Sequence, residues 1–461
     1  MTVRLLATIL TGSMLMTACT GGTPTATAPA PTAGAPAASI LVAEKEITLS
    51  AGGEAVLALR ASAPGTAWGR KGAEAATVSI HVDGTYKADV VLFRGETAFT
   101  YEALLGELTA GKHQVAVRLE PGKSAAAAGK VTVEDAAVRV YPPGDPLYEV
   151  MAYAPILYGR DESRYSDTPL FTYYEVTQDG GNKAIQYTWI FSNEDGGTAA
   201  DALMSRWGRL TDIEWVYRVT VTPGGNPAGV VVKEEFQDKD HNTVAFKGSK
   251  NGRHPLLKNV TRNNLFADVG TSAYRFALVP AETLTAGSRE EMMDLHPWTY
   301  RVMAEEWERE AQEATEKTAS ADTRQVSDPR NYLYVEFNSG PLPGQPCDGK
   351  LAFQAKLREG DKWYSSDHGV DSLRIQGAVG WRRGTIELPP GTTAGQVEAL
   401  RFVMYPGKTT TCALAVTGVR KVFFLGQDYT PGPSLWAWSG QQVLDADPAS
   451  ATPDSFTLPS R

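Results

Sequence analysis

A short loop in the middle of the chain gathers side chains that could do chemistry. Ser192-Asn-Glu-Asp-Gly-Gly-Thr198 follows an aromatic segment and places Glu194 and Asp195 beside two glycines. Carboxylates on a glycine-rich loop can bind a hard cation such as Ca²⁺, or can act as the acid and base of a hydrolase. Because Asp-Gly-Gly is also typical of a hairpin turn, a purely structural loop is the alternative.

A second group of carboxylates follows further along the chain. Arg206-Trp-Gly-Arg209 precedes Asp212 and Glu214. If a strand begins at Asp212, both carboxylates project from one face of it, where they could share a proton or bind a cation. With the loop carboxylates they could also act as acid and base on a glycosidic bond. A salt-bridge network with the two arginines is the structural alternative.

Two further polar loops contain histidine. Gly252-Arg-His-Pro255 presents His254, which could act as a base or a ligand, or could be satisfied within its own loop. Asp238-Lys-Asp-His-Asn242 begins like a calcium loop. Thr243 stands where such a loop needs glycine and Ser249 where it needs glutamate, so we expect a polar hairpin tip there instead.

Aromatic side chains in the last third of the chain could bind a sugar, because the C–H face of a sugar ring packs well on an aromatic ring. The candidate platform consists of Trp363, Tyr364 and Trp381, with Arg382, Arg383 and Asp367 nearby for hydroxyl groups. Burial of these rings in the core of a β-sandwich is the alternative.

The composition argues against several other classes of protein. The 461 residues include 44 basic and 53 acidic side chains, a net charge of −9, without a block of lysine or arginine. Nucleic acid is therefore not an expected partner. GxSxG, HExxH and phosphate-binding glycine-rich motifs do not occur in the sequence. No cofactor other than Ca²⁺ is suggested, and the oligomeric state stays open.

The N-terminus of the chain has the pattern of an export signal. Met1–Arg4 is positive, Leu5–Met16 is apolar and small residues precede Cys19, so residues 1–18 are predicted to be a signal peptide. Met16-Thr-Ala-Cys19 resembles the bacterial lipoprotein box, with methionine where leucine is usual. This resemblance implies that Cys19 is diacylated, becomes the mature N-terminus and anchors the protein to a membrane of the bacterial cell envelope. An ordinary secretion signal is the alternative.

Residues 19–38 are rich in threonine, proline and alanine and should form an extended tether. Cys347 and Cys412 are then the only remaining cysteines, 65 residues apart (412 − 347). In an exported, β-rich region such a pair is predicted to form a disulfide. Two free thiols are the alternative.

Short alternating segments separated by turns predict a mainly β, multi-domain protein of β-sandwich and jelly-roll architecture. One amphipathic helix, at about 298–317, is predicted in the middle domain from the spacing of Tyr300, Met303 and Trp307. A weaker helical pattern covers Tyr101–Leu108. The predicted parts are an N-terminal β-sandwich at 39–140, a middle β-rich domain at 147–319, a linker at 320–328, a C-terminal jelly-roll-like β-sandwich at 329–444 and a disordered tail at 445–461.

The middle domain resembles the vacuolar-protein-sorting-sixty-two-related family. The resemblance is carried by Tyr153-Ala-Pro-Ile-Leu-Tyr158, Gln186-Tyr-Thr-Trp-Ile-Phe191, Asp212-Ile-Glu-Trp215 and Gly252-Arg-His254. The family's Asp-Trp-Glu-His order is absent, because the third segment has these residue types in another order and no histidine follows its glutamate. The resemblance implies a β-rich fold and no particular reaction.

Three hypotheses about function follow. The first is a cell-envelope lipoprotein whose β-sandwich modules bind a surface ligand, most plausibly a glycan. The second is a hydrolase of envelope or extracellular polysaccharide, which requires the carboxylates and His254 to meet in one cleft. The third is a scaffold for envelope assembly, which requires an extended apolar patch on one sandwich face.

Overall fold

The computed structural model describes residues 38–161, 167–194, 197–223, 229–311, 326–344, 347–377, 379–407, 412–447 and 453–459. Residues from Ala37 onward form one compact unit. About 49% of the structure is strand and 11% is helix, which confirms the mainly β fold class. The predicted signal peptide, Cys19 and nearly all of the tether lie outside the described residues, as does Asp195.

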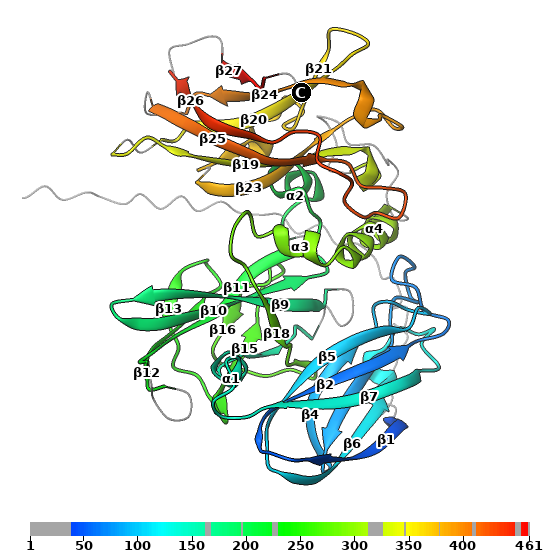
Figure 1. Ribbon diagram of the computed structural model, residues 1–461. Helices are drawn as coiled ribbons and strands as arrows, with labels where there is room; N and C mark the ends of the chain where they lie inside the picture. Colours follow the sequence, from blue (N-terminus) through cyan, green and yellow to red (C-terminus); the bar gives the residue numbers. More distant parts are fainter. Residues whose placement is uncertain are drawn as a thin grey trace, which may run out of the picture. The chain divides into compact units, whose positions relative to one another are not determined.

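Two antiparallel sheets, in the orders β1-β6-β3-β4 and β5-β2-β7, make an N-terminal β-sandwich (Figure 1). Asp83 and Gly84 form the tight turn of a β-hairpin, and both residues have positive φ, 50° and 76°, as such a turn requires. The strands are β1 (Ile40–Leu49), β2 (Gly53–Ser62), β3 (Thr77–Val82), β4 (Thr85–Val91), β5 (Phe99–Leu108), β6 (Gly111–Leu119) and β7 (Thr132–Tyr141).

The helix suggested by the pattern at Tyr101–Leu108 is not formed, since this segment belongs to strand β5. Its whole length pairs with β2, and Tyr101 and Ala103 are buried, at 4% and 2% exposure. Pairing with a central strand outweighs the helix propensity of the Glu-Ala-Leu-Leu stretch, as tertiary context often does.

The middle region contains a six-stranded sheet, in the order β13-β12-β11-β10-β9-β18, and a second sheet in the order β14-β15-β8-β17, with β16 on β15. The polar hairpin tip predicted at Asp238–Asn242 joins β12 and β13. The strands are β8 (Ile156–Tyr158), β9 (Pro169–Asp179), β10 (Asn182–Phe191), β11 (Asp212–Val221), β12 (Val231–Gln237), β13 (Thr243–Ala245), β14 (Lys250–Asn251), β15 (His254–Asn259), β16 (Phe266–Ala267), β17 (Arg275–Phe276) and β18 (Pro280–Thr283).

The predicted amphipathic helix is α4 (Trp298–Ala311), and the remainder of its predicted range lies outside the described residues. Tyr300 and Met303 are fully buried, as the spacing predicted. The sequence did not predict three short helices, α1 (Tyr148–Ala152), α2 (Ala200–Trp207) and α3 (Glu291–Leu295). Within the described ranges, no helix is long and apolar enough to cross a membrane.

The C-terminal part is a β-sandwich of sheets β23-β19-β25-β26 and β21-β20-β24-β27, with β22 on β20. The closing strand β25 lies beside the opening strand β19, as in a jelly roll. The strands are β19 (Tyr332–Pro341), β20 (Lys350–Leu357), β21 (Trp363–Ser365), β22 (Ile375–Gln376), β23 (Gly380–Glu387), β24 (Val397–Tyr405), β25 (Cys412–Phe423), β26 (Trp438–Ala446) and β27 (Asp454–Thr457).

Two segments predicted to lack structure are ordered where the structure describes them. In the predicted tail, β27 pairs with β24, because Phe456 packs on Trp438 and Leu458 is only 5% exposed. At the end of the predicted linker, Val326 is buried and its carbonyl accepts a hydrogen bond from Trp307. A few apolar side chains are therefore enough to hold these short segments against the fold.

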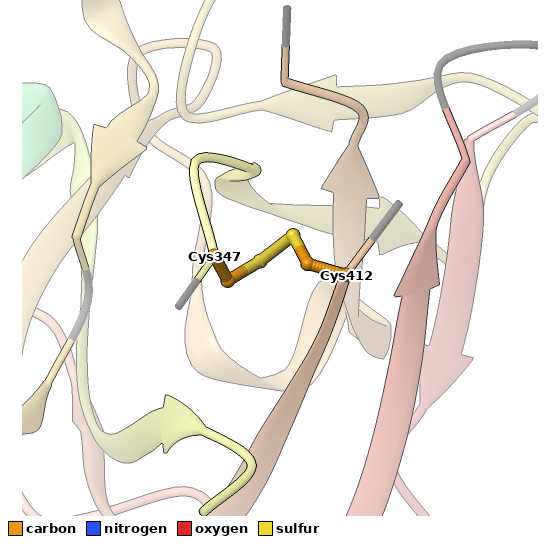
Figure 2. The surroundings of a disulfide bond; sticks show 2 residues. All are labelled: Cys347 and Cys412. Carbon is orange, nitrogen blue, oxygen red and sulfur yellow. A yellow bond between two sulfur atoms is a disulfide. The ribbon is translucent and has the colours of Figure 1, made fainter. Parts of the chain in front are cut away.

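Cys347 and Cys412 form the predicted disulfide (Figure 2). Cys347 lies in the loop before β20, and Cys412 is the first residue of β25. The disulfide therefore links the segment that leads into β20, in one sheet, to the start of β25, in the other sheet. Beside it, an apolar core fills the C-terminal sandwich. A second core is continuous from the N-terminal sandwich into the middle region.

Candidate functional site

The predicted carboxylates Glu194, Asp212 and Glu214 come together in the middle region. Strands β10 and β11 are antiparallel neighbours, with Phe191 opposite Asp212 at the end where β10 finishes and β11 begins. Glu194 lies three residues after the end of β10, so the loop that carries it is adjacent to the start of β11. Asn264 bridges them, donating to Asp212 Oδ2 at 3.1 Å and to the Asn193 carbonyl at 2.9 Å.

Arginines surround this carboxylate cluster. Arg209 Nη1 lies 3.6 Å from Asp212 Oδ1, and its Nε donates to Glu290 Oε1 at 3.1 Å. Arg289 donates from Nη1 to the Ile213 carbonyl at 2.6 Å. Arg209 belongs to the salt-bridge network that was the structural alternative, whereas the guanidinium of Arg206, its other predicted member, lies 4.3 Å from the centroid of the Trp207 ring.

Burial and mutual repulsion shift the proton affinity of the cluster. Burial, followed by the charge of Asp212, raises the pKa of Glu194 to about 7 and that of Glu214 to about 8. Burial also raises the pKa of Asp212. The cluster therefore holds protons near neutral pH, but Glu194 and Asp212 are only 5% and 1% exposed, so a polymeric substrate does not reach them in this conformation.

His254 does not join the carboxylates. It opens strand β15, donates from Nδ1 to the Ala154 carbonyl at 2.9 Å and places Nε2 3.2 Å from Glu54 Oε2. Glu54 belongs to β2 of the N-terminal sandwich, so His254 contributes to a different part of the molecule. The cleft required by the hydrolase hypothesis does not form from these residues, and the predicted Ca²⁺ loop includes Asp195, outside the described residues.

The aromatic residues proposed as a sugar platform are divided between two sheets. Trp363 and Tyr364 lie on β21, whereas Trp381 lies on β23 of the other sheet. The Trp363 ring has the Arg401 guanidinium 4.0 Å from its centroid, and Tyr364 packs partly into the sandwich core.

The two arginines of that platform are held by the protein itself. Arg382 donates to the Gly377 carbonyl at 3.1 Å. Arg383 is 1% exposed and donates from Nη2 to Asp294 Oδ2 and Glu336 Oε2, each at 2.7 Å. Arg383 is therefore not available to a ligand at the surface. Glu291, Asp294 and Glu336 are close enough together to hold a metal ion, but Arg383 already supplies the opposite charge there.

An aromatic pocket of about 220 Å³, which the sequence did not reveal, lies where the N-terminal sandwich contacts the middle region. We define the aromatic pocket by its principal lining residues, Phe93, Phe99, Phe171, Glu282, His296 and Trp298. Each aromatic ring in this set except Phe93 is partly exposed. Lysine and arginine are absent from the described residues that line it.

The rings of the aromatic pocket are fixed by packing on one another. Trp298, the first residue of α4, stacks on Phe93 with ring centroids 5.3 Å apart and meets Phe99 edge-on at the same distance. Phe171 lies 4.5 Å from the His296 ring. Such interlocking rings are rigid, so the pocket is largely pre-formed.

Polar groups stand at one side of the aromatic pocket. His296 Nε2 lies 3.8 Å from Glu282 Oε1, is buried and has no hydrogen-bond partner among the described residues. Burial lowers the pKa of His296 despite the nearby carboxylate, so the imidazole is neutral at neutral pH. A neutral imidazole and a carboxylate can together donate to and accept from a ligand's hydroxyl groups.

No protein-family model and no curated protein matches the chain. Among solved structures, the chain is similar to the EclA C-terminal domain, described as a sugar-binding protein, with 21% identity over 22% of this chain and 68% of that one and a TM-score of 0.17. It is also similar to the M60 catalytic domain with the CBM51-1 and CBM51-2 domains from Clostridium perfringens ZmpB, with 8% identity over 78% of this chain and 31% of that one and a TM-score of 0.15. At these TM-scores neither structure defines the fold of this chain.

Proposed function

We propose that this chain is a bacterial cell-envelope lipoprotein, anchored through Cys19, whose β-rich head binds a glycan in the aromatic pocket. The observation that carries the proposal is the combination of partly exposed, rigid rings with a neutral histidine and a carboxylate in one concavity. Apolar walls with a few convergent polar groups are typical of small-molecule sites.

Sugar rings suit this pocket for two physical reasons. Their C–H faces are apolar and pack on rings such as Phe99 and Trp298, while their hydroxyl groups need donors and acceptors at the edge. The partly exposed carboxylate of Glu282 supplies an acceptor there, next to the buried Nε2 of His296. The described lining has no lysine or arginine and includes the carboxylates of Asp89, Glu102 and Glu282, so we do not expect an anionic part of the ligand in this pocket.

The raised pKa values of Glu194 and Glu214 favour a second candidate function, a polysaccharide hydrolase, because a general acid must be protonated near its working pH. Burial in a salt-bridge network and the separate place of His254 argue against it. A Glu194→Gln variant separates the two functions. Glycan binding unchanged by the substitution, with no sugar released by either protein, supports binding without catalysis.

The direct test uses the compact unit that begins at Ala37, screened on a glycan array and then titrated calorimetrically with an oligosaccharide that it retains. Trp298→Ala removes the central ring, and Glu282→Gln changes only a rim carboxylate, 45% exposed, without disturbing the packing. Trp363→Ala is the matched control on the other candidate surface. We expect both pocket variants to weaken binding at least tenfold and the control to bind normally. Loss of binding in Trp363→Ala alone would move the site to the C-terminal sandwich.

A further inference from the structure

A second pocket, of about 130 Å³, lies close to the aromatic pocket and has the opposite electrostatic character. We define this basic pocket by three partly buried cations, Lys87, Arg253 and Arg275. Lys87 belongs to β4 of the N-terminal sandwich, while Arg253 and Arg275 belong to the middle region. The cations therefore converge from segments far apart in the chain.

None of these three cations has a carboxylate partner within 4.0 Å among the described residues. Arg253 donates to the Tyr148 hydroxyl at 2.8 Å, and Arg275 donates from Nη1 to the Tyr86 carbonyl at 3.3 Å. The buried Nε of Arg275 has no acceptor in the part of the chain that the structure describes. Burial and the neighbouring Arg275 charge lower the pKa of Lys87. Like charges held together at a pocket favour the binding of an anion.

The acidic groups at the basic pocket offset its charge only in part, and the negative charges of Asp83 and Glu54 act on Lys87. Glu54 is 2% exposed, and its carboxylate faces His254 Nε2 at 3.2 Å. Glu107 lines the edge of the pocket with an exposed side chain. The three cations of the pocket thus exceed its two carboxylates by one.

The two pockets are neighbours along the same strands. In each of three segments, one stretch lines the basic pocket and the adjoining stretch lines the aromatic pocket. These paired stretches are Lys87 and Asp89–Val91, Leu104–Glu107 and Phe99–Ala103, and Arg275 and Phe276–Val279. The centres of the paired stretches lie about 2.5 to 4.5 residues apart, which at about 3.3 Å per extended residue corresponds to about 8–15 Å, more than a single sugar ring covers.

We propose that the basic pocket binds an anionic group, a carboxylate or a phosphate, carried by the glycan whose neutral ring occupies the aromatic pocket. That the anionic group belongs to a glycan rests on the proposed function, whereas the anion site itself rests only on Lys87, Arg253 and Arg275. The ligand is then an acidic oligosaccharide. Two arms of the experiment, uronate-bearing and phosphate-bearing, distinguish the two sources of negative charge.

The first experiment tests the anion site without any glycan. Inorganic phosphate and glucuronate are titrated separately into the unit beginning at Ala37, and the melting temperature is followed, because a ligand stabilises the state that binds it. Lys87→Gln removes one cation of the pocket, and Lys130→Gln is the matched control, since Lys130 is exposed on the same sandwich and outside the pocket. We expect at least one of the two anions to stabilise the wild type and the control, and to stabilise Lys87→Gln much less. Equal shifts in all three proteins with both anions overturn the anion site.

The second experiment compares a neutral, a uronate-bearing and a phosphate-bearing oligosaccharide of equal length by calorimetry. We expect the wild type to prefer one acidic ligand, and Lys87→Gln to lose about tenfold or more of that affinity, since a hydrogen bond to a charged group contributes about 1.5–3 kcal/mol. Its affinity for the neutral ligand should not change. If the anions stabilise the protein but no oligosaccharide binds, the proposed function fails and the anion site stands. If the oligosaccharides bind with equal affinity to wild type and Lys87→Gln, the anion site fails and the proposed function stands.

Discussion

The buried cluster around Glu194 makes a quantitative prediction about stability and pH. Raising the pKa of Glu194 from 4.5 to about 7 corresponds to about 3 kcal/mol, since each pKa unit is worth about 1.4 kcal/mol. The folded chain holds a proton on this group that the unfolded chain has released between those pH values. The free energy of unfolding therefore falls as pH rises from about 4.5 to about 7, by about 3 kcal/mol from this group.

Glu194→Gln keeps the shape of the side chain and removes its ionisation. We expect the free energy of unfolding of this variant, relative to the wild type, to rise by about 3 kcal/mol between pH 4 and pH 8. Chemical denaturation followed by tryptophan fluorescence at several pH values measures it. Glu359→Gln, at an exposed glutamate, is the control and should track the wild type. Parallel pH profiles for Glu194→Gln and the wild type would refute the assignment of Glu194 to a buried, protonated cluster.

Three further predictions concern other parts of the chain. Replacing both Cys347 and Cys412 by serine should lower the free energy of unfolding by about 4 kcal/mol, because the disulfide closes a 65-residue loop. Chemical denaturation checks this, and the midpoint of the double variant should equal that of the reduced wild type. Arg383→Ala should lower the free energy of unfolding by about 3–5 kcal/mol, because it leaves the buried carboxylates of Asp294 and Glu336 without this ion-pair partner. Arg382→Ala loses one hydrogen bond to a carbonyl and should lower it much less; thermal unfolding of the two variants makes the comparison. Cys19→Ser should move the protein from the membrane fraction to the soluble fraction, and a variant that stays in the membrane fraction would exclude a lipid anchor.

Structural features that depend only on residues close together in the sequence could be predicted. The hairpin at Asp83-Gly84 needs only two residues that accept positive φ, and α4 needs only the spacing of Tyr300 and Met303. The approach of Glu194 to Asp212 was also within reach, because the two flank the connection between adjacent antiparallel strands. The same local patterns missed β27, whose four residues are too few to show alternation.

Features made by distant residues were not predictable from one sequence. Phe93, Phe171 and Trp298 form one pocket although 205 residues separate the first from the last (298 − 93). His254 finds Glu54 200 residues away, in another sheet. Neither residue spacing nor composition predicts these long-range contacts, since they depend on how the N-terminal sandwich packs on the middle region. The sequence therefore predicted aromatic sugar recognition on Trp363, Tyr364 and Trp381, whereas the pocket that we propose for it is formed by residues far apart in the chain.

The central claim, that a glycan ring lies on the rings of the aromatic pocket, is tested most directly by saturation-transfer-difference NMR. The protein's aromatic protons are irradiated in the presence of the oligosaccharide selected on the array, for the wild type, Trp298→Ala and Trp363→Ala. We predict strong transfer to the sugar C–H protons in the wild type and in Trp363→Ala, and its loss in Trp298→Ala. Undiminished transfer in a correctly folded Trp298→Ala protein would contradict the account.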